Sequence, residues 1–125
     1  MPPTTIVAFR EADGSVPILD WLDNLSDAVR DKCVIRLELL AEQGHDLRRP
    51  HADVLRDGIH ELRVRHQRVN FRMLYFFHGR RAVVMSHGLT KQQARVPEVE
   101  IARALRRMGH FQSNPTHRTY SQVLP

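Results

Sequence analysis

Three runs rich in β-branched and aromatic residues follow one another closely in the second half of the chain, over residues 59–66, 69–78 and 81–87. Residues of these kinds favour strands, because their side chains pack well on a pleated surface. The breaks between the runs are short and polar, as in hairpin turns. The sequence therefore predicts three consecutive strands in one antiparallel sheet.

The N-terminal part predicts one more strand and two helices. Residues 4–10 alternate weakly between apolar and polar side chains and precede a turn, which indicates a first strand. Ser15 is a suitable N-cap for a short helix that ends near Ser26. Asp27 can cap a second helix that continues to Gln43, because apolar residues recur there at helical spacing.

Polar residues 45–58 are expected to form a loop with one helical turn at most. A last helix is predicted to begin at Pro97 and to stop at Gly109, since proline suits a first helical turn and glycine a helix end. The remaining residues 110–125 have no period and are predicted to be a flexible tail. We expect one α+β domain over residues 1–109.

Charge is divided unevenly along the chain, whose net charge is +5. Residues 1–47 contain nine acids and four bases, whereas residues 48–125 contain five acids and fifteen bases. Such a separation predicts a surface that meets an acidic partner, either phosphate or an acidic protein segment. The alternative is a basic face that is merely solvated.

Several classes of protein are not expected. No apolar run has the length needed to span a bilayer, and the first residues do not resemble an export signal, so we expect a cytoplasmic protein. Cys33 is the only cysteine and lies in the apolar pattern of the second helix, where a buried thiol is expected. The histidines have no metal-ligand spacing, so neither a metal site nor a cofactor is predicted.

Arginines gather in the predicted strands. Alternation places Glu61, Arg63 and Arg65 on one face of the first strand of the three. Arg72 interrupts an apolar run in the next strand, where a guanidinium group needs an anion or a cleft. Guanidinium groups bind two phosphate oxygens at once, so this cluster suits an RNA backbone. Alternatively, Glu61 neutralises one arginine and the others are solvated.

His87 and Lys91 follow in the segment SHGLTK, where the third strand is expected to end at His87. An imidazole there can transfer a proton near neutral pH, and a lysine among arginines can serve as a base. The alternative is a structural His87 that is hydrogen-bonded to the backbone.

Four segments, DGIHELRVR, FRMLYFF, VVMSHGLTK and PEVEIARAL, occur in the order and spacing typical of RelE/HigB toxins. Over about residues 57–108 the chain resembles this superfamily, and in particular its phage-derived HigB-like members. The resemblance implies a RelE-like fold, in which a small twisted antiparallel sheet carries two N-terminal helices on one side and a C-terminal helix.

The resemblance also implies a toxin that enters the ribosomal A site and cuts mRNA as a metal-independent endoribonuclease. A ribose 2′-hydroxyl would attack its own 3′-phosphate, with Lys91 or His87 taking the proton and with Arg63 and Arg72 stabilising the charge. Positions that would hold the RNA backbone are Arg65, Arg68 and Arg95. Many HigB-like toxins have a second lysine in this segment, where this chain has Gln92 and Gln93.

Toxins of this kind imply partners besides the ribosome and mRNA. The expected partner is a cognate helix-turn-helix antitoxin, and through that complex the toxin would contact operator DNA. Two alternatives remain. One is inhibition of DNA gyrase, as in the related ParE toxins, and the other is a non-catalytic nucleic-acid-binding or co-repressor module.

Overall fold

The computed structural model describes residues 4–91 and 95–121, with the exception of the side chain of Lys91. Its centre is a six-stranded sheet in the order β2-β3-β4-β5-β1-β6. The strands are β1 (Thr5–Phe9), β2 (Ala52–Arg56), β3 (Ile59–His66), β4 (Val69–His78), β5 (Ala82–Lys91) and β6 (Thr119–Tyr120). The helices are α1 (Pro17–Asp23), α2 (Asp27–Gln43), the 3-10 helix η1 (Gly44–Asp46), α3 (Glu98–Ser113) and α4 (Pro115–Arg118).

Strands β2 to β5 form an antiparallel meander, as the short turns between them require. The first strand, β1, joins the far side of β5 and runs parallel to it, with Thr5 opposite Ala82. The short β6 then pairs antiparallel with β1. The sheet is therefore mostly antiparallel, and the expected α+β class is confirmed.

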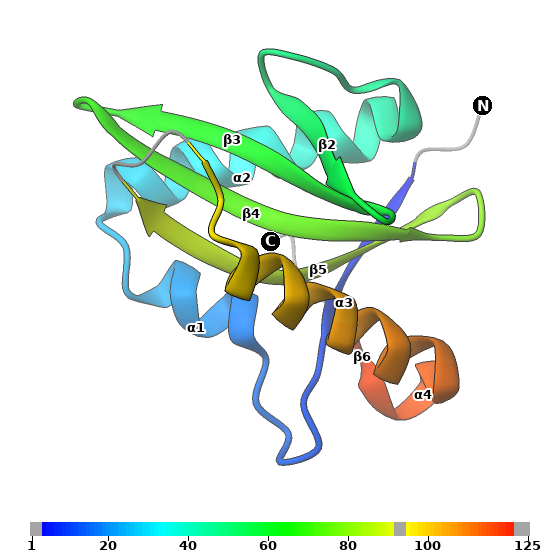
Figure 1. Ribbon diagram of the computed structural model, residues 1–125. Helices are drawn as coiled ribbons and strands as arrows, with labels where there is room; N and C mark the ends of the chain where they lie inside the picture. The colour runs from blue at the N-terminus through cyan, green and yellow to red at the C-terminus, as the bar shows by residue number, and fades with distance from the viewer. Residues whose placement is uncertain (1–3, 92–94, 122–125) are drawn as a thin grey trace.

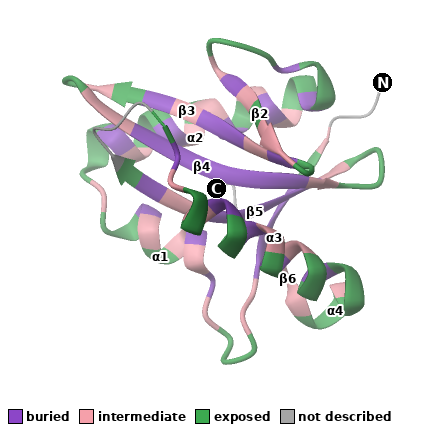
Figure 2. Cartoon of the chain, viewed as in Figure 1, coloured by how far each residue is buried: buried purple, intermediate pink, exposed green. Residues whose placement is uncertain are grey.

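Helices cover both faces of the sheet (Figure 1). Helices α1 and α2 pack on one face, where alternate sheet residues such as Leu62, Met73 and Met85 join one apolar core. Helix α3 packs on the other face, over a second core that contains Leu74 and Phe76. Most of β4 is consequently buried between the two layers (Figure 2).

The two central hairpin strands have the predicted bounds, 59–66 and 69–78. The turn between them consists of Gln67 and Arg68, both with left-handed backbone, at φ 49° and 70°. This geometry matches the twist of the flanking strands and is usual in two-residue hairpins. The prediction from β-branched residues and a short polar break is therefore confirmed.

Helix starts differ slightly from the prediction. Ser26, rather than Asp27, is the N-cap of α2, and its hydroxyl oxygen accepts a hydrogen bond from the backbone N–H of Val29 at 3.3 Å. Val16 precedes α1 at the N-cap position, because Ser15 instead bonds the carboxylate of Asp13. Both predicted helices are otherwise present.

Two predictions about strands were wrong. Residues 45–58 are not only a loop, since they include the edge strand β2. Strand β5 does not end at His87 but continues to Lys91, which is thus the last strand residue and not part of a following loop. Gly88 lies inside this strand. A Cβ atom at this position would lie 2.0 Å from Cδ2 of Trp21, so the packing of the Trp21 ring requires glycine here.

The predicted end of the last helix was also wrong. Helix α3 passes through Gly109 and ends at Ser113, because Phe111 is buried against Phe76 with ring centroids 5.8 Å apart. Residues 110–121 are therefore part of the fold, through α3, α4 and β6, and are not a flexible tail. Residues 122–125 of the predicted tail lie outside the described part of the chain.

Cys33 is fully buried on the core-facing side of α2, as predicted. Burial raises the pKa of its thiol to about 11. No helix in the described residues combines the length and apolar character that a passage through a bilayer requires.

Candidate functional site

Arg63 and Arg72 lie directly opposite each other on the neighbouring strands β3 and β4. Between them lies the carboxylate of Glu61, which is only 3% exposed. Its Oε1 accepts a hydrogen bond from Nε of Arg63 at 2.6 Å and lies 3.5 Å from Nε of Arg72. Alternation along β3 and the cross-strand register therefore bring the predicted cluster together, and Glu61 partly neutralises it.

The ion pairs extend from this cluster toward β2. Asp53 lies 3.4 Å from Nη2 of Arg63 and 2.7 Å from Nη2 of Arg49. The hydrogen bond from Arg49 is the main reason why the pKa of Asp53 is lowered. Arg63 is thus held between two carboxylates, which fixes the position of its guanidinium group.

Arg65 differs from these arginines, because it is exposed and makes no ion pair with any residue that the structure describes. It lies on the same strand and face as Glu61 and Arg63, opposite Asn70 of β4. Asn70 in turn pairs with Lys91 of β5. The register therefore places Arg65, Asn70 and Lys91 in one row across three strands, although the side chain of Lys91 lies outside the described residues.

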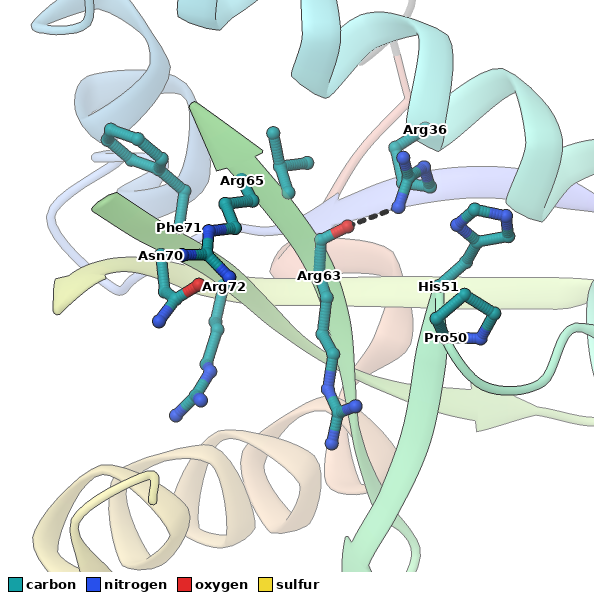
Figure 3. A pocket seen from close by; sticks show the side chains of 9 residues that line it. Arg36, Pro50, His51, Arg63, Arg65, Asn70, Phe71 and Arg72 are labelled. Atoms are coloured by element: carbon teal, nitrogen blue, oxygen red, sulfur yellow. Dashed lines mark hydrogen bonds between the residues drawn. The ribbon is translucent and has the colours of Figure 1, made fainter. Parts of the chain in front are cut away.

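A pocket of about 390 Å³ opens beside this cluster (Figure 3). It forms where β2 stops covering the edge of β3, just beyond the hydrogen bond from the backbone N–H of Arg63 to the carbonyl oxygen of His51. The polar residues that line it come from α2, from the start of β2 and from β3 and β4: Arg36, His51, Arg63, Arg65, Asn70 and Arg72. A concave site with several cations suits a phosphate group.

His87 has a different environment. It lies in the middle of β5 beneath α3, is 6% exposed and does not line the pocket. Its Nδ1 lies 2.7 Å from Oγ of Ser86, and its Nε2 lies 3.1 Å from Oε1 of Glu100. Burial, and then the positive charge of Arg107, lower the pKa of His87 to about 4. In this structure its imidazole connects β5 to α3 and is closed to solvent.

The other predicted RNA-binding residues lie outside the pocket. Arg68 is exposed in the turn between β3 and β4, and Arg95 is exposed just before α3. The structure therefore brings together Arg63, Arg65 and Arg72, but not Arg68, Arg95 or His87. Among the described residues, no group of three His, Cys, Asp or Glu side chains is arranged to hold a metal ion.

Sequence reasoning missed two residues of the pocket, Arg36 and His51. Arg36 belongs to a helix whose other charged residues are mostly acidic, so no local pattern set it apart. His51 lies in the polar segment that was expected to be a loop. Only the tertiary arrangement of α2, β2 and β3 brings both beside Arg63.

Residues 20–109 match the family model described as phage-derived protein Gp49-like (DUF891). This region extends from α1 through most of α3 and includes the pocket and the arginine cluster. No curated protein matches the chain.

Proposed function

Since the chain belongs to the family of phage-derived Gp49-like proteins, we propose that it is the toxin of a type II toxin–antitoxin module. The family is toxin-like and is associated with such modules, which supports this reading. We further propose that its activity is cleavage of mRNA on the ribosome, as a metal-independent endoribonuclease of the RelE/HigB kind.

The observation that carries the proposal is the pair of guanidinium groups that Arg63 and Arg72 place side by side around Glu61. A phosphate undergoing displacement gains negative charge, and preorganised donors stabilise that charge most when they need not move. Glu61 and Asp53 hold Arg63 in place before any substrate binds. The exposed Arg65 would then hold the RNA backbone at the mouth of the pocket.

The partners that we propose agree with the charge of the second half of the chain, which contains five acids and fifteen bases. Ribosomal RNA and mRNA supply the acidic surface during cleavage. An acidic segment of a cognate helix-turn-helix antitoxin would cover the same surface and neutralise the toxin, and the complex would bind operator DNA. We accordingly propose that the protein acts in the cytoplasm.

The test is induced expression of the chain in a bacterial host, with growth followed and mRNA 5′ ends mapped. We expect growth arrest and new 5′ ends inside reading frames. Arg65→Ala is the sharpest variant, because Arg65 makes no ion pair with described residues and its removal should leave the fold intact. Arg106→Ala, at an exposed position on α3, is the matched control.

Loss of both effects in Arg65→Ala and in Arg72→Ala, with Arg106→Ala unchanged, would support the endoribonuclease. Growth arrest with intact mRNA and broken DNA would instead indicate inhibition of gyrase. If all three variants retain cleavage, the arginine cluster is not the site.

Two observations favour a second candidate, a non-catalytic RNA-binding or co-repressor module. Glu61 neutralises part of the cluster, and His87, a predicted proton acceptor, is buried and hydrogen-bonded. Such a module would bind RNA with an affinity that falls steeply with salt. It would give no cleavage products under any condition, which separates it from the enzyme.

A further inference from the structure

We propose that a second pocket, at the β1 and β6 edge of the sheet, binds a phosphate group of an RNA backbone. This pocket lies between the turn that follows β1 and the short helix α4, and its volume is about 420 Å³. The sheet order places β1 and β6 at one edge and β2 and β3 at the other, so this pocket and the arginine cluster lie in different parts of the molecule (Figure 1). The inference concerns binding and holds whether or not the chain cuts mRNA.

The lining of this second pocket is polar. Its polar residues come from the turn after β1 and from the segment around α4: Arg10, Glu11, Asn114, His117 and Arg118. Among the described residues that line it, none has a large apolar side chain. Protein partners are usually held by large aromatic or apolar anchors, whereas an RNA backbone is held mainly by charged and polar groups. The lining therefore favours RNA over an acidic protein segment.

Arg10 is held in a position that suits a phosphate. Its Nε donates a hydrogen bond to the carbonyl oxygen of His117 at 3.2 Å, and its backbone N–H donates to the carbonyl oxygen of Arg118 at 2.8 Å. Neither Nη group of Arg10 has a hydrogen-bond partner in the described part of the chain. A guanidinium group fixed through its Nε can therefore offer its remaining N–H groups to two phosphate oxygens at once.

The charges around the second pocket are mostly positive. Arg10 and Arg118 are permanent cations, and His117 adds a further charge when it is protonated. Glu11 also lines the pocket, but its carboxylate lies 3.8 Å from Nη2 of the buried Arg107, which offsets its charge. A concave surface with an excess of positive charge raises the local concentration of anions. The electrostatics therefore favour a phosphate group as the ligand.

Both walls of the second pocket are fixed by hydrogen bonds. In the turn after β1, the backbone N–H of Glu11 donates to the carbonyl oxygen of Ser15 at 2.8 Å. The carboxylate of Asp13 accepts hydrogen bonds from the backbone N–H and the hydroxyl group of Ser15. Helix α4 leads directly into β6, where Thr119 pairs with Phe9 of β1. A site whose walls are already in place loses less conformational entropy when a ligand binds.

The experiment measures the affinity of the full chain for an RNA hairpin, without ribosomes, over a series of salt concentrations. The main variant is Arg118→Gln, because the side chain of Arg118 makes no hydrogen bond or ion pair with the described residues. Arg10→Gln is the second variant, and thermal unfolding shows whether each variant folds. The matched control is Arg80→Gln, an exposed arginine in the turn between β4 and β5. If Arg10→Gln unfolds, Arg118→Gln decides alone.

We expect each pocket variant to bind the RNA about tenfold more weakly, because a hydrogen bond to a charged group is lost. The slope of log affinity against log salt concentration should fall by about one, as expected for the loss of one phosphate contact. Arg80→Gln should bind within about twofold of the wild type, since an exposed charge far from the RNA is screened by salt. Unchanged affinity in the pocket variants, or an equal loss in Arg80→Gln, would overturn the proposal.

Inorganic phosphate and a polyglutamate peptide separate RNA from other anions. Phosphate, titrated while backbone amide signals are followed by NMR, should shift the signals of Asn114 and His117 in the wild type but not in Arg118→Gln. If phosphate shifts these signals while all chains bind RNA equally, the pocket takes a free anion and the proposal is wrong. If the peptide binds the pocket more tightly than the RNA does, the partner is an acidic protein and the proposal is wrong as well.

The outcomes also separate this site from the proposed endoribonuclease. A wild-type chain that cuts no mRNA, with RNA binding weakened in both pocket variants, would refute the enzyme and support the second site. Normal cleavage by the wild type, with unchanged RNA affinity in the pocket variants, would refute the second site and leave the enzyme in place.

Discussion

Arg36 of helix α2 donates a hydrogen bond from Nη1 to the backbone carbonyl oxygen of Arg63 in β3. This carbonyl lies where β3 no longer has β2 as a neighbour, just past the last hydrogen bond between them. The guanidinium group therefore supplies the hydrogen bond that a neighbouring strand would otherwise donate to this carbonyl. It closes one backbone position at the rim of the pocket and ties α2 to the strand that carries the cluster.

Replacing Arg36 by methionine would keep most of the aliphatic stem and remove the donor. We expect the free energy of unfolding to fall by about 1–2 kcal/mol, because a part-buried carbonyl group loses its partner. Urea denaturation measures this change. Lys32→Met, at an exposed position of the same helix, is the control and should change stability little. An equal loss in both variants would show that the hydrogen bond contributes nothing.

Replacing Glu61 by glutamine would remove the negative charge between Arg63 and Arg72. We expect a loss of about 2–4 kcal/mol in unfolding free energy, since the buried carboxylate that contacts both guanidinium groups would lose its charge and their mutual repulsion would increase. Inorganic phosphate should recover part of that stability in the variant and have a smaller effect on the wild type, because the anion would replace the carboxylate.

Urea denaturation of both chains, with and without phosphate, measures the loss of stability and its recovery. Glu38→Gln, an exposed change on α2, is the matched control. A Glu61→Gln chain as stable as the wild type would mean that the buried carboxylate does not organise the cluster.

Acid should destabilise the fold through His87. Its pKa is lowered to about 4 in the folded chain, mainly by burial, whereas an unfolded histidine titrates near 6.5. The unfolded chain therefore binds the proton first, and stability falls as the pH drops from about 6.5 to about 4. Above this window His87 is neutral in both states and contributes no pH dependence.

The measurement is urea unfolding between pH 7.5 and 4.5 for the wild type and for His87→Gln, in which the amide keeps hydrogen-bonding capacity. We expect the wild type to lose on the order of 2–3 kcal/mol more than the variant across the window. Parallel curves for the two chains would refute the assignment to His87.

Two glycines should respond to alanine in opposite ways. A Cβ atom on Gly88 would lie 2.0 Å from the ring of Trp21, so Gly88→Ala should cost about 3 kcal/mol or prevent folding. Gly109 has no atom within 4 Å of an added Cβ and lies inside α3, so Gly109→Ala should stabilise by about 0.5–1 kcal/mol.

The clash can be separated from any intrinsic effect of alanine in β5. In a Trp21→Ala background the ring is absent, and Gly88→Ala should then cost clearly less than in the wild type. A cost that is the same in both backgrounds would mean that Trp21 is not the reason for the glycine.

The central hairpin could be predicted from sequence because its information is local. In β3 and β4 the alternation, the β-branched residues and the short turn all agree, and the bounds were correct. The position of Arg63 followed from the same alternation, and Arg72 was singled out because it interrupts an apolar run. What could not be seen was that one carboxylate, Glu61, would contact both arginines, because this depends on the register between strands.

The wrong predictions share a different cause, which is tertiary contact overriding a local signal. The third strand was expected to end at His87, but Gly88 continues it, since Trp21 from a helix far away in sequence packs where a Cβ atom would be. Gly109 suggested a helix end, but the burial of Phe111 against Phe76 keeps α3 intact. The edge strand β2 is short and contains two charged residues, so its pattern resembled a loop. His51, which directly precedes β2, lies in the same polar segment and was missed for the same reason.

The place of β1 in the sheet has a consequence for the order in which the chain can assemble. Strands β2 to β5 each pair with a strand that is close to them in sequence, whereas β1 must wait for β5, with Thr5 paired to Ala82. Contacts over such long separations form slowly, since the intervening loop must close first. During synthesis β1 therefore leaves the ribosome well before its partners β5 and β6 are made, so this side of the sheet stays open until β5 has been translated.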